Sequence, residues 1–253
     1  MGAKVILTIC GRAGSKGFKN KNLKTFCGKP LVHYSLSAAE LFCRLRPDLK
    51  IDIVLNTDSG LLRELVVNSY PEVTALNRPA SLCGDTVPKM AVFQQSVRQM
   101  EERRGERYDF HMDLDITSPL RTAADVAACY AKMEQGQGLD VVMSAVKSRR
   151  SPYMNMAKRV EDHVEQVVPT RFTARQQVPQ CYDLNASVYV FRRAFLAQNE
   201  TGFLWDGKCE IVEMEDTAVL DIDSEEDFEL MELIARHLYA QKPSFAEVRD
   251  NIR

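Results

Sequence analysis

The sequence has no long apolar run and no excess of one charge. No window approaches the roughly 20 apolar residues of a membrane-spanning helix, and no charged stretch leads into an apolar segment near residue 1, so we expect neither a membrane span nor a signal peptide. The 253 residues include 33 basic and 35 acidic side chains, a formal net charge of −2. Because no overall field attracts nucleic acid or a membrane surface, we expect neither as a partner, and any basic site must be local.

Cysteines are few and follow no pattern. The seven cysteines are odd in number, widely scattered and never in C-x-x-C spacing. This argues against a disulfide framework and against a zinc site. Several lie inside apolar runs, where a reduced cysteine packs as a small hydrophobic residue. We therefore expect a reducing, cytoplasmic setting.

The sequence does contain a regular alternation of two apolar patterns. Short, continuous apolar runs such as residues 5–10 and 51–58 are typical of buried strands, and apolar positions of helical period occupy residues 61–70 and 121–133. Strands that alternate with helices predict an α/β fold with a mainly parallel sheet.

One segment breaks this alternation. Residues 147–183 carry Pro152, Pro169 and Pro179 together with many charges, which indicates an inserted arm rather than another strand–helix unit. We interpret residues 1–253 as a single domain from which this arm projects.

The first apolar run ends in a loop with three glycines spaced by three residues. Its glycines, Gly11, Gly14 and Gly17, fit neither the P-loop nor the dinucleotide-binding formula. Ligands bind beyond the carboxyl ends of parallel strands, and a glycine loop there can bring backbone N–H groups near a phosphate. A solvated basic loop is the alternative. The side chains that would supply donors and charge to an anion are Arg12, Ser15, Lys16 and Lys21.

A second feature is acidic. Residues 218–223, AVLDID, are predicted to form a strand, in which Asp221 and Asp223 would share one face and could hold Mg²⁺. Acidic residues also favour helix starts, but Ser224 and Asp227 already form a capping box for the helix that follows. A basic anion loop and an acidic pair are what metal-assisted phosphoryl or nucleotidyl transfer requires.

Two further segments carry polar groups at turns. In residues 114–122, LDITSPLRT, a strand runs into Ser118 and Pro119, where hydroxyls could hold a ribose or a sugar. A plain turn would have a similar sequence. Arg175 precedes a glutamine-rich stretch, and a guanidinium suits a carboxylate. A surface arginine is the commoner interpretation of any single arginine.

Together these segments resemble the motifs of the acylneuraminate cytidylyltransferases, the CMP-sialic acid synthetases. Five motifs occur in the family's order over nearly the whole chain. The matching segments are residues 11–17 with 21–22, 78–86, 117–122, 175–179 and 221–223.

The resemblance implies both an architecture and a reaction. The fold would be a Rossmann-like three-layer α/β domain whose arm, residues 147–183, reaches into a second subunit, so that a homodimer shares its sites. The reaction would transfer CMP from CTP to the anomeric hydroxyl of a nonulosonic acid, with release of pyrophosphate and with Mg²⁺ as cofactor.

The resemblance also assigns residues to roles. The implied catalytic residues are Arg12, Lys21, Asp221 and Asp223, of which the two aspartates would hold the metal ion. The implied nucleotide-binding residues are Arg12, Ser15, Lys16, Lys21, Asn22 and Arg78. The implied sugar-binding residues are Asp115, Thr117, Ser118, Arg175, Gln176 and Asn185.

Two departures affect the substrate. The family usually has Gln-Pro before T-S-P-L-R, and here Asp115 and Ile116 stand there; its first motif begins with alanine, and here with Gly11. Because an ionised carboxylate only accepts hydrogen bonds, the ligand group at Asp115 should be a donor. N-acetylneuraminic, legionaminic, pseudaminic and deaminated acids all stay open as substrates.

Other functions stay open as well. One is a related sugar nucleotidyltransferase that uses Kdo or another nucleotide. The other is a catalytically silent protein that binds a nucleotide or a sugar. Such a protein would be expected to lose the basic loop or the acidic pair, and both are present.

Overall fold

A seven-stranded sheet organises the chain, and it confirms the predicted mainly parallel α/β architecture. The computed structural model describes residues 2–14, 17–217 and 221–253. The sheet strands are β1 (Lys4–Gly11), β4 (Lys50–Thr57), β5 (Thr74–Asn77), β6 (Phe110–Leu114), β7 (Val141–Lys147), β10 (Tyr182–Arg192) and β11 (Cys209–Glu213). Their order is β11-β7-β10-β6-β1-β4-β5. In the described sheet β10 runs antiparallel to β6 and β7, and the other neighbouring pairs are parallel.

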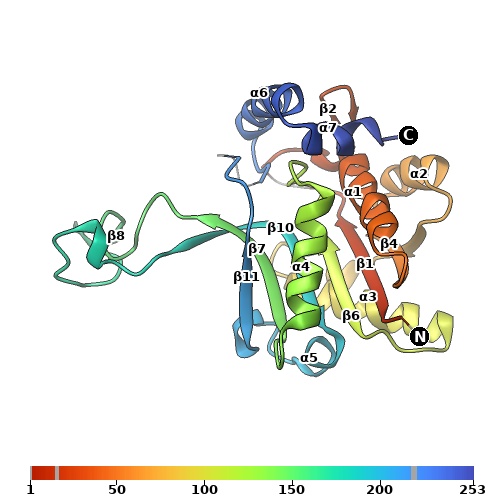
Figure 1. Cartoon of the computed structure of the whole chain (residues 1–253), viewed down its shortest axis with the longest axis horizontal. Helices are drawn as coiled ribbons and strands as arrows, with labels where there is room; N and C mark the ends of the chain where they lie inside the picture. Colours follow the sequence, from red (N-terminus) through yellow and green to blue (C-terminus); the bar gives the residue numbers. More distant parts are fainter. Residues whose placement is uncertain (1, 15–16, 218–220) are drawn as a thin grey trace.

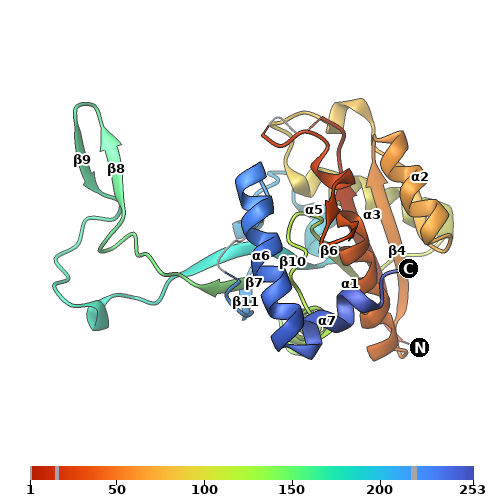
Figure 2. The ribbon, with the colours of Figure 1, turned by 90° about the horizontal axis from the view of Figure 1, so that it is seen from above.

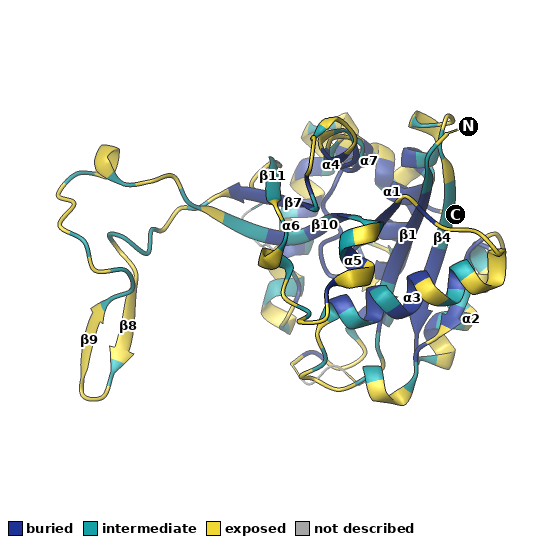
Figure 3. Ribbon diagram, turned by 90° about the horizontal axis from the view of Figure 1, so that it is seen from below, coloured by how far each residue is buried: buried dark blue, intermediate teal, exposed yellow. Residues whose placement is uncertain are grey.

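Helices cover both faces of this sheet and give three layers (Figures 1 and 3). Alternate side chains of β1 enter different cores, since Val5, Leu7 and Ile9 belong to one and Ile6 to the other. The helices of the larger core are α1 (Leu31–Leu45), α2 (Gly60–Ser69), α4 (Ala123–Gln135), α6 (Glu225–Gln241) and α7 (Pro243–Asp250). The helices of the smaller core are α3 (Lys89–Arg104) and α5 (Arg193–Gln198). Within the described ranges, no helix combines the length and the apolar character needed to cross a membrane.

Local sequence fixes where two helices begin. Thr122 and Asp125 form the predicted capping box of α4, and Ser224 and Asp227 form that of α6. In each box the hydroxyl and the carboxylate satisfy backbone N–H groups that have no partner within the helix. The remaining short elements are β2 (Thr25–Phe26), β3 (Lys29–Pro30), η1 (Lys21–Leu23), η2 (Ala80–Leu82), η3 (Arg175–Gln177) and η4 (Leu204–Asp206).

Between β7 and β10 the chain leaves the sheet as a projecting arm (Figures 1 and 2). Its outer part carries an antiparallel hairpin of β8 (Ala157–Val160) and β9 (His163–Gln166). Large apolar side chains on the arm are solvent-exposed in the single chain, including Met156, Val164 and Phe172. The arm lies where the proline-rich break predicted it. That it binds a second subunit stays a prediction.

The predicted strand at residues 218–223 is wrong in its described part. Asp221, Ile222 and Asp223 belong to no strand, and residues 218–220 lie outside the described residues. The Ile222 side chain is fully buried, and its N–H donates to the Thr117 carbonyl at 2.9 Å. This anchor holds the segment as an irregular connection before α6. The apolar strand β11 was not predicted.

Candidate active site

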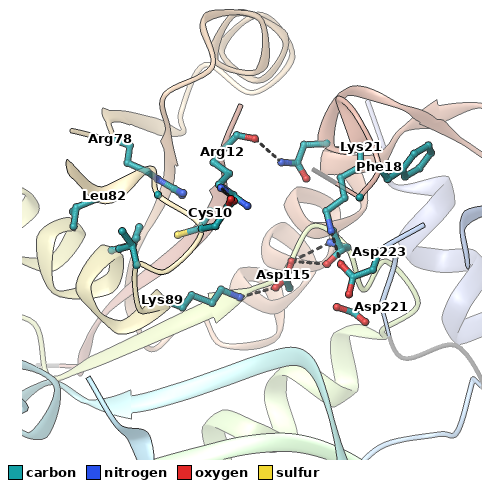
Figure 4. A pocket seen from close by; sticks show the side chains of 17 residues that line it. Cys10, Arg12, Phe18, Lys21, Arg78, Leu82, Lys89, Asp115, Asp221 and Asp223 are labelled. Carbon is teal, nitrogen blue, oxygen red and sulfur yellow. Dashed lines mark hydrogen bonds and ion pairs between the residues drawn. The ribbon is translucent and has the colours of Figure 1, made fainter. Parts of the chain in front are cut away.

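A cavity of about 760 Å³ opens at the carboxyl ends of β1, β5 and β6 (Figure 4). Polar side chains reach it from the loops that follow these strands, from η1 and from the segment before α6. Several predicted site residues from distant parts of the chain therefore meet in one place. Those that line the cavity are Arg12, Lys21, Asn22, Arg78, Asp115, Thr117, Asp221 and Asp223.

The glycine loop and the acidic segment are joined directly. The Lys21 ammonium lies 2.9 Å from Asp223 Oδ1 and donates to the Ile222 carbonyl at 2.7 Å. Gly17 packs so closely on this segment that a Cβ there would lie 2.8 Å from the Asp223 carbonyl oxygen. A glycine is required at this contact because the opposing atom belongs to the backbone, which cannot rotate away.

Arg12 is oriented by acceptors from the segment that contains η2. Its Nη1 lies 2.6 Å from Asp85 Oδ1 and donates to the Cys83 carbonyl at 3.2 Å. The peptide bond after Arg12 is also held, because Asn22 Nδ2 donates to the Arg12 carbonyl at 3.3 Å and the Ala13 N–H donates to Asp58 Oδ1, in the loop after β4, at 2.7 Å. Asp85 lies in a matched motif, although no role was predicted for it from the sequence.

Arg78 is buried in the wall of the cavity and is held rigidly. Its Nε donates to Asn56 Oδ1 at 2.8 Å, and its Nη2 donates to the Asn56 carbonyl at 3.0 Å. Asn56 is fixed in turn, because its Nδ2 donates to Gln95 Oε1 at 2.6 Å and to Ser96 Oγ at 2.8 Å. Among the described residues no carboxylate forms an ion pair with Arg78, so this network places a cation beside the cavity.

The two carboxylates of the acidic segment both face the cavity, although no strand aligns them. The pKa of Asp221 is raised, first by burial and then by the negative charges of Asp223 and Asp115, against the opposing effect of Lys21. A divalent cation would relieve this excess of negative charge. Among the described residues no group of three or more His, Cys, Asp or Glu side chains has metal-binding geometry. Mg²⁺ is commonly held by one or two carboxylates together with substrate phosphates, which this pair fits.

Lys89, the first residue of α3, is a cavity residue that the sequence analysis missed. Its ammonium lies 2.6 Å from Asp115 Oδ2 and 3.0 Å from Asp113 Oδ2. Burial alone would raise the pKa of Asp115, but the charge and hydrogen bond of Lys89 and the hydrogen bonds of Thr117 lower it to about 2. A signal was present, because Asp113 and Asp115 lie two residues apart at a strand end, on one face, and require a cation.

Two predicted sugar-binding residues lie elsewhere. Ser118 and Asn185 are buried, and neither of these described residues lines the cavity. Ser118 Oγ donates to the Asn185 carbonyl at 2.9 Å, and Asn185 Oδ1 accepts from Ser144 Oγ at 2.6 Å. In this single chain the two side chains connect the turn after β6 to β7 and β10.

Arg175 and Gln176 are on the arm, in η3, and neither lines the cavity of its own chain. Arg175 borders a separate hollow of about 180 Å³ formed by the arm itself. Ser15 and Lys16, the remaining predicted nucleotide-binding residues, lie outside the described residues.

The chain has relatives among known proteins. The family model described as "Cytidylyltransferase" matches residues 6–242. Post-translational flagellin modification protein B of Campylobacter coli is 34% identical over 244 residues, which cover 96% of this chain and all of that protein. CMP-N,N'-diacetyllegionaminic acid synthase of Campylobacter jejuni is 33% identical over 233 residues, which cover 92% of this chain and 95% of the relative.

The fold has a solved counterpart. A CMP:2-keto-3-deoxy-manno-octonic acid synthetase in complex with CTP superposes with a TM-score of 0.65, at 14% identity, over 93% of this chain and all of the other. At 14% sequence identity this similarity is evidence for the fold alone. The family model spans both the glycine loop and the segment of Asp221 and Asp223, which meet at the cavity. The chain therefore belongs to the cytidylyltransferase family.

Proposed function

We propose that this protein transfers CMP from CTP to the anomeric hydroxyl of a nonulosonic acid and releases pyrophosphate. The observation that carries the proposal is the 2.9 Å ion pair between Lys21 and Asp223 inside one cavity. It joins the basic loop near the start of a cytidylyltransferase chain to the acidic pair some 200 residues later. A site for a triphosphate and a site for a metal ion thereby become a single reaction centre.

Arg12 and Lys21 would bind the triphosphate and stabilise the departing pyrophosphate. Both side chains line the cavity and are held in place by hydrogen bonds or ion pairs to the chain itself. Charge that is fixed before the reaction stabilises the leaving oxygens without reorganisation. Asn22 and Arg78 would contact the nucleotide, as the resemblance implies, and so would Ser15 and Lys16.

Asp221 and Asp223 would hold Mg²⁺ against the phosphates. When bound, the ion neutralises charge on the phosphoryl oxygens and orients them. The chain supports this role because both carboxylates face the cavity and burial together with Asp223 and Asp115 raises the pKa of Asp221. Lys21, which bonds Asp223 and the Ile222 carbonyl, would keep the pair beside the phosphate loop.

The acid that we favour is legionaminic acid in its N,N'-diacetyl form, the acid in the name of the Campylobacter jejuni relative. The Asp115 in place of the family's glutamine also argues against a site identical to that of the N-acetylneuraminic acid enzymes. Asp115 and Thr117 line the cavity and would lie towards the acid.

We further propose a homodimer in which the arm of one subunit completes the partner's cavity. Arg175 and Gln176 cannot reach the sugar acid within their own chain as described, because they lie on the projecting arm (Figure 2). Val164, with 60% of its surface exposed, and Phe172, with 38%, give the arm apolar contact surface. Light scattering coupled to gel filtration should give twice the chain mass, and a monomer that turns over substrate would contradict the shared site.

The experiment that tests the reaction measures pyrophosphate release. The purified protein is incubated with Mg²⁺, with CTP or another nucleoside triphosphate, and with legionaminic, pseudaminic, N-acetylneuraminic or deaminated acid or Kdo. We expect turnover with CTP and fastest turnover with the legionaminic acid. Turnover only with Kdo or only with another nucleotide would assign a related transferase. A folded protein that binds CTP but turns over none of the acids would contradict the proposal and favour a silent binding protein.

A further inference from the structure

Lys89 occupies a position that helix stability alone would not select. It is the first residue of α3, where the positive end of the helix dipole disfavours a cation. It also pairs with Asp113, whose side chain is fully buried. Local disagreement with the rules of stability is expected at functional sites.

The ammonium of Lys89 is held from several directions. Among the described residues its ion-pair partners are Asp115, at 2.6 Å, and Asp113, at 3.0 Å. Thr8 Oγ1 donates to the other oxygen of Asp113 at 2.7 Å, which fixes that carboxylate. The ammonium also lies 5.7 Å and 5.5 Å from the ring centroids of Phe93 and Tyr189. Of these two contacts only the one with Asp115 is a hydrogen bond, because Asp113 Oδ2 has no hydrogen-bond partner among the described residues, and the Lys89 side chain still has 39% of its surface exposed.

Asp115, by contrast, has both oxygens engaged by the protein. Oδ2 accepts from Lys89 at 2.6 Å, and Oδ1 accepts from the Thr117 N–H at 3.1 Å and from the Thr117 hydroxyl at 3.0 Å. The sequence suggested that Asp115 would accept from a donor on the ligand. In the structure the group presented to a ligand is instead a remaining N–H of Lys89, so the matching ligand group is an acceptor.

The surroundings of Lys89 suit a flat, partly apolar ligand group. The cavity is also lined by Leu82, Val87 and Val92, of which the two valines lie close to Lys89 in sequence, and small-molecule pockets combine apolar walls with a few polar contacts. In Figure 4 the Lys89 side chain enters from the side of Arg78 and Leu82, and its ammonium points to Asp115.

Arg78 and Lys89 share Cys10 as a neighbour. The pKa of the Cys10 thiol is raised by burial and by Asp113, while Arg78 and Lys89 both oppose the rise. Cys10, Arg78 and Lys89 all line the cavity, and in Figure 4 the Cys10 side chain is drawn between those of Arg78 and Lys89.

We propose that Lys89 donates a hydrogen bond to the carbonyl oxygen of the pyrimidine base of the bound nucleotide, and that Asp115 is a positioning residue that acts through Lys89. The inference rests on the proposed use of CTP but not on the identity of the sugar acid.

The test compares CTP with inorganic tripolyphosphate, which has the charges but no base, by calorimetry without sugar. In Lys89→Met we expect CTP to bind about 10- to 100-fold more weakly, the loss typical of a hydrogen bond to a charged group. Tripolyphosphate should bind within about threefold of wild type, because salt screens a charge that lies away from the phosphates. Lys21→Met should weaken both ligands. Equal losses for both ligands in Lys89→Met, unchanged CTP affinity, or an effect only on the KM of the sugar acid would overturn the proposal.

A double-mutant cycle tests the positioning role. Asp115→Asn alone should weaken CTP binding, but it should have no further effect in the Lys89→Met background, whereas a direct contact of Asp115 with CTP would make the two losses add. Lys89→Gln keeps an N–H donor and should recover part of the affinity. Lys89→Met leaves Asp113 and Asp115 without their cation. The double variant Lys89→Met/Asp115→Asn removes one of these two charges, so it can be used to measure CTP binding if Lys89→Met alone does not fold. The CTP-binding results and the turnover assay are separate tests. If CTP binding changes as expected but no nonulosonic acid is turned over, the proposed reaction is contradicted and the proposed role of Lys89 is still supported.

Discussion

Replacing Lys21 by methionine should remove catalysis while leaving the fold intact. Methionine keeps most of the apolar stem and removes the ammonium, which bonds Asp223 Oδ1 at 2.9 Å and the Ile222 carbonyl at 2.7 Å. Asp223 has 75% of its side chain exposed, so the ion pair contributes about 0–1 kcal/mol to stability. With the hydrogen bond to the carbonyl, the total loss should be about 1–2 kcal/mol.

The loss of stability and the loss of activity in Lys21→Met differ enough in size to be measured separately. For a chain of this size, about 1–2 kcal/mol lowers Tm by about 2–8 °C, so the variant stays folded at 25 °C. Loss of one fixed donor to the departing pyrophosphate costs about 100-fold or more in kcat. Lys19→Met is the matched control, because Lys19 lies in the same loop, is exposed and does not line the cavity.

The assay is pyrophosphate release with CTP and Mg²⁺, run beside a thermal scan. Lys19→Met should stay within about twofold of wild-type activity, as expected for a surface substitution. Lys21→Met with near wild-type turnover would refute the assignment of Lys21 to the phosphates. An equal loss in both variants would show that the general charge of the loop matters rather than the Lys21 position.

Three further substitutions probe other contacts. Asp223→Asn should abolish turnover and leave Tm nearly unchanged, since the side chain is largely exposed; normal pyrophosphate release would exclude a metal role. Gly17→Ala should lower activity by displacing the acidic segment, because its Cβ would lie 2.8 Å from the Asp223 carbonyl oxygen, whereas Gly60→Ala meets open space and should behave as wild type in the same assay. Asp115 has its pKa lowered to about 2, so its contribution to stability is present above pH about 4 and is lost as the pH falls towards about 2. Urea unfolding at pH 5 and pH 3 should show a smaller loss in Asp115→Asn than in wild type, and equal losses would contradict the pairing.

Much of the site could be predicted because its parts have local signatures. The glycine loop after the first strand places Arg12 and Lys21 at the carboxyl edge of the sheet, as its position predicted. Asp221 and Asp223 also reach the cavity, but not for the predicted reason. They do so because the buried Ile222 between them anchors an irregular segment, a long-range contact that two-residue periodicity does not contain.

Other residues lie where the sequence did not predict, or were missed, because their environment is set by partners far along the chain. Asn185 was predicted to bind sugar, yet its side chain is buried and bonded to Ser144. Lys89 was missed, because its partners Asp113 and Asp115 are on a strand that follows a 16-residue helix and a turn. A motif shows which residue types are present, but not whether a neighbouring charge has already engaged them.

The sequence by itself determined the alternating α/β order, the capped starts of α4 and α6, and the family to which the motifs belong. These follow from periodicity and hydrogen bonds that span a few residues. Only the tertiary structure decided that Lys21 meets Asp223, and that Asp115 holds Lys89. The physical reason is the strand order, which places β6 and β4 on either side of β1 and brings loops from distant segments to one edge of the sheet.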